Sequence, residues 1–186
     1  MPEVCTTNDS STWCLFKSVS GTNLARVCGS SRNQACTSSQ STDYDPIRFP
    51  ASNGNDGVVD GFTSTGGAPG VCNVLPVDLT PWWMVDLGNT ASIGGGTIWG
   101  RSDCCQFRLD GFQIWVGSSG SAYNTAGNTK CYTSTTFEHH VPPYTHRFDC
   151  VASGRYLWLV LATGNCLSIR EIEVYSIGEN PFLYPG

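Results

Sequence analysis

The chain has 186 residues, which suits one domain with additions, and it is 40% hydrophobic, 11% aromatic and only 13% charged, as in a globular protein. The net charge is −5 and no run of Lys or Arg occurs, which argues against binding to nucleic acid or to an anionic membrane surface, because both need a basic patch. No apolar stretch reaches the ~20 residues of a membrane-spanning helix, so we expect no membrane insertion.

The cysteines indicate a disulfide framework. There are ten of them, spaced widely and irregularly apart from the adjacent pair Cys104-Cys105, and none forms the C-x-x-C clusters that are typical of zinc sites. Because disulfides persist in oxidising compartments, this pattern predicts a secreted, extracellular protein.

The ends of the chain differ in composition from the middle. Residues 1–22 are small and polar and include two cysteines, so we expect an N-terminal extension that disulfides tie down. Residues 23–176 form the expected main domain. Residues 177–186, with Pro181 and Pro185, are expected to form an extended tail.

Strand signals recur along the main domain, whereas no long stretch keeps apolar residues at helical spacing. Short apolar segments are separated by turn residues, and they predict strands at 82–87, 92–99, 111–116, 155–161 and 169–175. Several short strands with Gly- and Asn-rich turns predict an all-β fold, a disulfide-rich antiparallel β-sandwich of jelly-roll type.

One loop carries the residues best suited to ligand binding. Arg101 and Arg108 bracket a tight element, and each guanidinium offers five donors in a rigid plane, which suits a polyol whose oxygens accept. Asp103 lies between them and can hold one Arg through a charge-assisted bond. The alternative is that both arginines are surface ion-pair partners.

Within the same loop, Cys104 and Cys105 can bond to each other. Such a ring presents a polarizable sulfur face, against which the apolar edge of a sugar can rest. The alternative is that each cysteine pairs with a distant one.

Four stretches together resemble the F-type lectin (fucolectin) family. Residues 81–88 (PWWMVDLG) resemble its NPWWRVDLG strand, 101–108 (RSDCCQFR) its RGDCCGER loop, 169–175 (IREIEVY) its LCEVEVY strand, and 56–61 (DGVVDG) lie where it has SNAVDG. The resemblance covers residues 23–176. It implies a discoidin-like, eight-stranded jelly roll.

The resemblance also implies a ligand. In F-type lectins the matching arginines and vicinal disulfide form the platform for fucose, so fucosylated glycans are the expected partners. The family's third sugar-binding residue is a His, and this chain has Val74 at that position, after Cys72 and Asn73. Either another side chain such as Asn73 substitutes for the His, or affinity and specificity differ from those of a standard fucose binder.

A structural Ca²⁺ is implied as well. Carried over by register, its ligands are the carbonyls of Gly57, Phe62, Val71 and Arg170 and the carboxylates of Asp60 and Glu171. Val71 stands where the family has a Ser, and Arg170 replaces a Cys. The alternative is that Asp60 is a turn residue and Glu171 a strand-surface residue.

The family's disulfide plan is altered by Arg170, and the nearest replacement cysteine is Cys166. The resemblance then implies three bonds, Cys72–Cys166, Cys104–Cys105 and Cys131–Cys150. Four cysteines are left to pair among themselves in an order that the sequence leaves open: Cys5, Cys14, Cys28 and Cys36.

The other function classes lack their residues. His139, His140 and His146 are expected in an exposed loop distant from the Arg101–Arg108 loop, with no metal or catalytic role, and no nucleophile–base or paired-carboxylate motif is present, so we expect no enzyme. The alternative to a lectin is a diverged discoidin-like module for adhesion or structure that binds protein or phospholipid. Agglutination would need several sites and hence a homo-oligomer, whose state the sequence does not define.

Overall fold

The computed structural model describes residues 5–8, 11–14, 21–29, 34–59, 61–63 and 77–179, and this part of the chain is all-β with short 3-10 helices. The strands are β1 (Cys5–Asn8), β2 (Ser11–Cys14), β3 (Thr37–Gln40), β4 (Trp82–Trp99), β5 (Phe112–Gly117), β6 (Asn128–Thr133), β7 (Thr145–Leu161) and β8 (Glu171–Ser176). The 3-10 helices are η1 (Leu24–Arg26), η2 (Ala51–Gly54), η3 (Gln106–Leu109) and η4 (Glu138–His140). Within these described residues no helix is long and apolar enough to cross a membrane.

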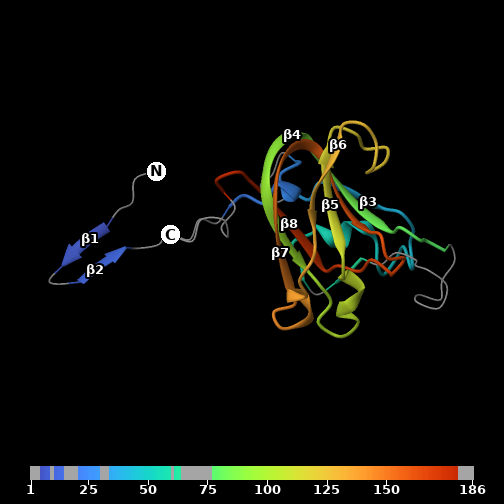
Figure 1. The fold of residues 1–186 in the computed structure, drawn as a ribbon, viewed down its shortest axis with the longest axis horizontal. Helices are drawn as coiled ribbons and strands as arrows, with labels where there is room; N and C mark the ends of the chain where they lie inside the picture. The colour runs from blue at the N-terminus through green and yellow to red at the C-terminus, as the bar shows by residue number, and fades with distance from the viewer. Residues whose placement is uncertain are drawn as a thin grey trace.

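Two long strands organise the sandwich. The hydrogen-bonded order is β3-β4-β7-β5-β6, and β8 also pairs with β4. The first half of β4 and the second half of β7 pair at 82–86 and 156–160, beside β3 and β5. Their other halves pair at 91–99 and 145–154, beside β8. In Figure 1 β4 and β7 curve together through the domain, which lets each strand serve both layers.

The predicted antiparallel sandwich is present, and the strand count depends on β4 and β7. Six of the described strands form the sheet assembly, and counting both halves of the two long strands separately gives eight strand segments. The predicted strands 82–87 and 92–99 are one strand with an irregularity between Asp86 and Ala91. Gly88 lies there with φ +77°, a conformation that favours glycine and allows the bend without ending the strand.

Alternation along the strands builds the core. In the first half of β4, Trp83, Val85 and Leu87 are buried, whereas the residues between them are half-buried. This period of two is that of a strand with one face on the core. In β5, Phe112, Ile114 and Val116 are buried in the same core. Burying such side chains is the main favourable contribution to folding, at about 25 cal/mol for each Å² of apolar surface.

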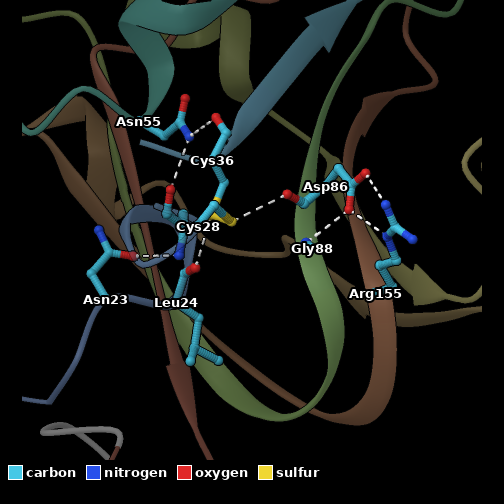
Figure 2. Close-up of a disulfide and its surroundings, with 9 residues drawn as sticks. Asn23, Leu24, Cys28, Cys36, Asn55, Asp86, Gly88 and Arg155 are labelled. Atoms are coloured by element: carbon cyan, nitrogen blue, oxygen red, sulfur yellow. Dashed lines mark hydrogen bonds and ion pairs between the residues drawn. A yellow bond between two sulfur atoms is a disulfide. The ribbon is translucent and has the colours of Figure 1, made fainter. Parts of the chain in front are cut away.

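The segment that precedes the sandwich is fixed to it by a disulfide and an amide. Cys28 and Cys36 are bonded, which identifies one pairing that the sequence left open. The buried Asn55 donates to the carbonyls of Ala25 (3.0 Å) and Cys36 (2.9 Å), as Figure 2 shows. Asn23 accepts from the Ala25 and Val174 amides, so η1 is also joined to β8.

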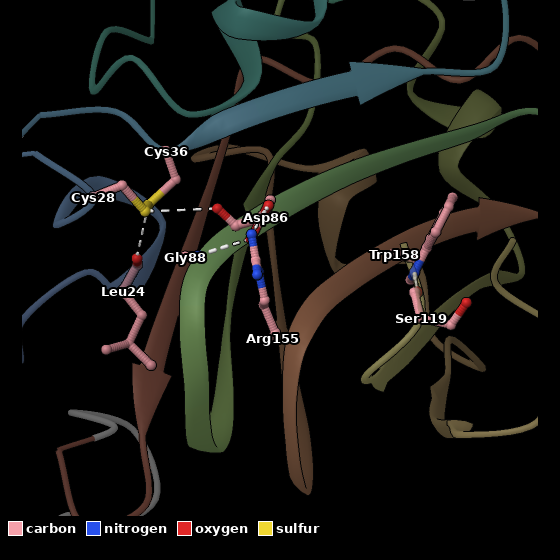
Figure 3. A network of polar contacts seen from close by, with 8 residues as sticks. All are labelled: Leu24, Cys28, Cys36, Asp86, Gly88, Ser119, Arg155 and Trp158. Atoms are coloured by element: carbon pink, nitrogen blue, oxygen red, sulfur yellow. Dashed lines mark hydrogen bonds and ion pairs between the residues drawn. A yellow bond between two sulfur atoms is a disulfide. The ribbon is translucent and has the colours of Figure 1, made fainter. Parts of the chain in front are cut away.

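An ion pair joins the two long strands where their register shifts. Arg155 on β7 donates from Nε and Nη2 to the two carboxylate oxygens of Asp86 on β4, at 2.6 and 2.7 Å (Figure 3). Asp86 also accepts from the Gly88 amide at 2.8 Å. The "DLG" sequence of the family motif therefore has a structural role, because it stabilises the bend of β4.

Candidate functional site

Arg101 lies directly after β4 and is held in a fixed orientation. Its Nε donates to Asp103 Oδ1 at 2.9 Å, and its Nη2 donates to Oδ2 of the same carboxylate. This bidentate pair lowers the pKa of Asp103 to about 2, because the ionised carboxylate accepts both bonds. The predicted pairing of Asp103 with one arginine of the loop is therefore present in the structure.

The guanidinium group of Arg101 also packs against aromatic rings. Arg101 Cζ lies 4.3 Å from the centre of the Phe62 ring, which stacks at 4.4 Å on Phe49. Tyr44 continues the row, 5.9 Å from Phe49. The sequence pointed to Phe62 only as a carbonyl ligand, and it gave no signal for Phe49 or Tyr44, because their contacts with the loop arise from tertiary folding.

The vicinal disulfide forms the turn of the loop. Cys104 and Cys105 are bonded, and Cys105 has φ +64° at the start of η3. Its carbonyl accepts from the Arg108 amide at 3.0 Å, while Gln106 Nε2 donates to the Arg101 carbonyl at 3.2 Å. These bonds close the loop on itself, so the disulfide and the two arginines belong to one rigid element.

Arg108 is the second cation of the loop and is half-buried. Burial is the main cause that lowers its pKa, and the nearby charge of Arg101 adds to it. Its Nε is buried, and no described residue accepts a hydrogen bond from it. A buried donor without an acceptor is costly, so a ligand oxygen at this position would be stabilising.

The side chain and the amide of Arg170 make contacts besides the carbonyl ligation that the resemblance implies. Its Nη1 donates to the Ser102 hydroxyl at 3.0 Å, and its amide donates to the Trp99 carbonyl at 2.7 Å. The residue that replaces the family cysteine thus joins the start of β8 to the base of the Arg101–Arg108 loop. Its carbonyl stays available to a cation, since these bonds use only its donors.

Glu171 is a buried carboxylate and not a strand-surface residue. Its Oε2 accepts from the Gly57 amide at 3.0 Å, and burial raises its pKa to about 8. Its Oε1 is buried, and no described residue donates to it. Together with Arg26, Gly57 and Trp99 it lines a cavity of about 660 Å³. A carboxylate oxygen that lacks a donor and faces a cavity has the chemistry of a hard-cation ligand.

Phe62 lies close in the fold to Glu171. The neighbouring Thr63 amide donates to the Ile169 carbonyl at 2.8 Å, which joins residues 61–63 to the approach to β8. The Phe62 carbonyl accepts from Asn53 Nδ2 at 3.2 Å and keeps a second lone pair. The remaining predicted ligands and sugar contacts lie outside the described residues: Asp60, Val71, Asn73 and Val74.

The disulfide predictions have the following outcome. Besides Cys104–Cys105, the structure contains the predicted Cys131–Cys150 bond, which joins β6 to β7. Cys166 is disulfide-bonded, and its predicted partner Cys72 lies outside the described residues.

The expectation that the histidines lie far from the Arg101–Arg108 loop is wrong, and the expected exposure holds for His140 only. His139 and His146 are fully buried, and His139 belongs to η4, which lies against η3. His139 and His140 both contact Asp110, two residues after Arg108. The sequence suggested an exposed loop because Pro142-Pro143 follows, whereas strand β7 begins at Thr145 and carries His146 inward.

The disulfide-linked β-sandwich, with a polar loop at the end of a long central strand, defines a discoidin-like binding domain. A model of NedA-like, galactose-binding domains of the F5/F8 type C class matches residues 53–159. Fucolectin from Anguilla anguilla is 31% identical over 145 residues, covering 77% of this chain and 87% of that protein. Fucolectin-5 from Anguilla japonica is 31% identical over 121 residues, covering 64% of this chain and 62% of that protein.

Solved structures agree with this class. The F-lectin (fucolectin) from Morone saxatilis (striped bass) serum superposes with a TM-score of 0.63 at 26% identity, covering 84% of this chain and 48% of that chain. The lectin domain of lectinolysin, solved with Lewis b antigen, superposes with a TM-score of 0.59 at 22% identity and supports the fold alone. The chain belongs to the F-type lectin (fucolectin) family of discoidin-like domains, and like these relatives it is a binding protein and not an enzyme.

Proposed function

We propose that this protein is a secreted lectin that binds L-fucose or fucosylated glycans at the Arg101–Arg108 loop. The observation that carries the proposal is that one closed turn holds two guanidinium groups. Asp103 and Phe62 fix Arg101, while Arg108 keeps a buried Nε that no described residue satisfies.

The chemistry of the loop suits a sugar. Guanidinium groups only donate, whereas the hydroxyl and ring oxygens of a sugar accept, and hydrogen bonds from charged donors are the strong ones. Asp103 uses Nε and one Nη of Arg101 and leaves its other N–H groups for a ligand. The Cys104–Cys105 sulfurs offer an apolar, polarizable face for the C–H edge of the ring.

The relatives support both the ligand and the location. Proteins similar to this chain are named fucolectins, and two structures with the same fold are a lectin domain solved with Lewis b antigen and a Streptococcus pneumoniae fucose binding module. The striped bass F-lectin comes from serum, and this chain shares the disulfide content that suits such a location. Asn73 and Val74 set the specificity in this proposal, because they occupy the segment where the family keeps its third contact.

A glycan array and calorimetry with L-fucose test the proposal. We expect fucosylated hits for the wild type and at least about tenfold weaker binding for Arg108→Ala, since a charged hydrogen bond contributes roughly 1.5–3 kcal/mol. Lys130→Ala is the matched control, because Lys130 is an exposed cation on β6 that contacts Trp115. Thermal melting of both variants separates lost binding from lost folding.

Two outcomes would contradict the lectin proposal. Either no fucosylated glycan binds, or the hits are indifferent to Arg108→Ala. Binding to liposomes or to protein ligands in place of glycans would favour the adhesion module.

We also propose a structural Ca²⁺ beside the loop, held by the carboxylates of Glu171 and Asp60 and by backbone carbonyls that include those of Phe62 and Arg170. Its support is the buried Glu171 Oε1, which no described residue satisfies. Bound Ca²⁺ would supply positive charge to this carboxylate. Since Arg170 bonds to Ser102, fixing the start of β8 also fixes the base of the sugar loop.

Chelation tests the calcium proposal. We expect a chelator to lower the melting temperature of the wild type by several degrees and added Ca²⁺ to restore it, because a ligand that binds only the folded state stabilises it. Glu171→Gln should remove this response, whereas Glu173→Gln, on the same strand and only half-buried, should keep it. A wild-type melting temperature that ignores both chelator and Ca²⁺ would overturn the calcium site.

A further inference from the structure

Three polar side chains converge at the junction of η3 and η4, and the carbohydrate site does not use them. Asp110 Oδ1 lies 3.0 Å from His139 Nε2 and 2.6 Å from His140 Nε2. The three potential ligand atoms lie within 4.8 Å of one another. Three protein ligand atoms that lie close together can bind a transition metal such as zinc, with one coordination position left open for water.

The cluster is open on one side and closed on the other. His139 is fully buried, while the side chains of His140 and Asp110 are 35% and 34% exposed. The buried His fixes the position of the site in the fold, and the two exposed ligands let an ion and water enter.

A second line of contacts orients the buried ligand. His139 Nδ1 lies 3.2 Å from His146 Nδ1, and His146 Nε2 lies 2.8 Å from the Tyr132 hydroxyl. A neutral imidazole carries one proton, so only one of the two facing Nδ1 atoms can donate to the other. Ligating histidines characteristically bond their second ring nitrogen to such a partner.

This chain of bonds can run in either of two directions, and only the first gives His139 Nε2 a hydrogen to donate to Asp110. In one direction Tyr132 donates to His146, which donates through Nδ1 to His139, and His139 then donates from Nε2 to Asp110. In the other, His139 Nδ1–H donates to His146 Nδ1, and His146 Nε2–H donates to the Tyr132 oxygen. The second direction leaves His139 Nε2 as a bare lone pair that faces Asp110 and His140, which is the form that a metal requires.

We propose that His139, His140 and Asp110 form a Zn²⁺ site, with water at the fourth position. Tetrahedral Zn²⁺ with ligand bonds of about 2.0–2.2 Å places its ligand atoms about 3.3 Å apart, and the separations of 3.0 and 2.6 Å from Asp110 Oδ1 to the two imidazole nitrogens are close to that spacing. Two imidazoles and one carboxylate suit Zn²⁺ and exclude a preference for Ca²⁺, which takes oxygen ligands. The carboxylate of Glu138, next to His139, adds negative charge to the surroundings.

The site lies where η3 and η4 meet, so a metal bound there should affect the stability of the fold. Asp110 follows η3, whose Arg108 belongs to the sugar loop, and both histidines belong to η4. A metal shared by these residues joins the two 3-10 helices by coordinate bonds. We therefore expect Zn²⁺ to stabilise the folded chain whether or not the protein binds fucose.

Calorimetry and melting of the full chain with Zn²⁺ alone test the site, after treatment with a chelator. We expect one Zn²⁺ per chain and a melting temperature about 5–10 °C higher at a hundredfold excess over Kd. His140→Ala, a half-exposed position, should weaken binding at least tenfold, as should Asp110→Asn. Asp149→Asn, an exposed acid on β7, is the matched control and should bind as the wild type does.

Two further readouts distinguish this site from the others. Co²⁺ added to the chelator-treated protein should give the visible absorption of a four-coordinate ion, Zn²⁺ should abolish that absorption by displacing Co²⁺, and excess Ca²⁺ should not compete. Glu171→Gln and Arg108→Ala should keep full Zn²⁺ affinity, so failure of the calcium or lectin proposals leaves this result intact. Absence of stoichiometric Zn²⁺ binding, or affinity unchanged in both His140→Ala and Asp110→Asn, would overturn the proposal.

Discussion

Arg101 and Arg108 carry like charges in one short loop, and the residues around them explain how the fold tolerates this. Asp103 neutralises Arg101 with a bidentate pair, and the face of Phe62 accepts its guanidinium. Among the described residues no carboxylate forms an ion pair with Arg108, and its lowered pKa reflects burial and the charge of Arg101. Within this part of the chain the Nε of Arg108 is an unsatisfied donor, which suits the electron-rich ligand that we propose.

Asp86 lies away from the proposed sugar site, and its carboxylate charge is predicted to stabilise the folded protein. Its bonds to Arg155 and Gly88 lower its pKa in the folded state, so its stabilising contribution is present above about pH 4 and is lost as the pH falls through the lowered value. Asp86→Asn should reduce the melting temperature at pH 7. The difference from the wild type should shrink as the pH falls through the lowered pKa of Asp86, because the protonated side chain loses its charge.

Melting curves of the two proteins between pH 2 and pH 8 provide the measurement. Asp149→Asn is the control, because Asp149 is an exposed acid on the same pair of long strands. A difference that stays constant over this range would show that the carboxylate charge of Asp86 does not stabilise the bend of β4.

At the scale of elements, the Cys131–Cys150 disulfide holds an edge strand. It joins β6, which pairs only with β5 among the described strands, to β7 at the centre of the sheet order. A bond that closes a loop across a sequence separation of 19 residues stabilises a protein by about 3 kcal/mol in the chain-entropy model. The double variant Cys131→Ala/Cys150→Ala should lose about that much free energy of unfolding.

Denaturant unfolding measures this loss. The matched comparison is Cys28→Ala/Cys36→Ala, whose shorter separation of 8 residues predicts a loss of about 2.5 kcal/mol. Equal stability of wild type and the Cys131/Cys150 variant would mean that sheet pairing alone holds β6.

The elements that the sequence predicted well are those with a clear period or a family motif. Segment 82–87 belongs to the PWWMVDLG motif, and the loop of 101–108 retains the order of its charged residues and cysteines. The short strands β3 and β6 were missed, because TSSQ and NTKCYT contain little apolar pattern and are held by their neighbours in the sheet. Propensity is a weak guide where tertiary pairing decides.

The site was only partly predictable for a similar reason. Residues close in sequence, such as Arg101 and Asp103, could be paired from spacing. The aromatic support of Phe62 and Phe49 and the packing of η4 against η3 bring together segments far apart in the chain. For the three histidines, no local pattern distinguished a buried cluster from an exposed loop.

At the scale of the whole molecule, the N-terminal hairpin and the sandwich are separate structural units. β1 and β2 pair with each other, in a register that places Cys5 opposite Cys14, and Figure 1 shows them away from the sandwich. With Cys28–Cys36 formed and with the predicted Cys72–Cys166 bond, Cys5 and Cys14 remain as partners for each other. We expect non-reducing peptide mapping to find this bond.

We expect the boundary between the hairpin and the sandwich to lie before Asn23, as the sequence predicts. Deletion of residues 1–20 should change the melting temperature of the sandwich by less than about 2 °C, because described strand pairings do not join the hairpin to it. Asn23→Ala should do more, since it removes acceptors from the amides of Ala25 and Val174, at a cost of about 1–2 kcal/mol or roughly 2–8 °C. If instead the deletion destabilises the protein more than Asn23→Ala does, the hairpin contributes to the fold of the lectin domain.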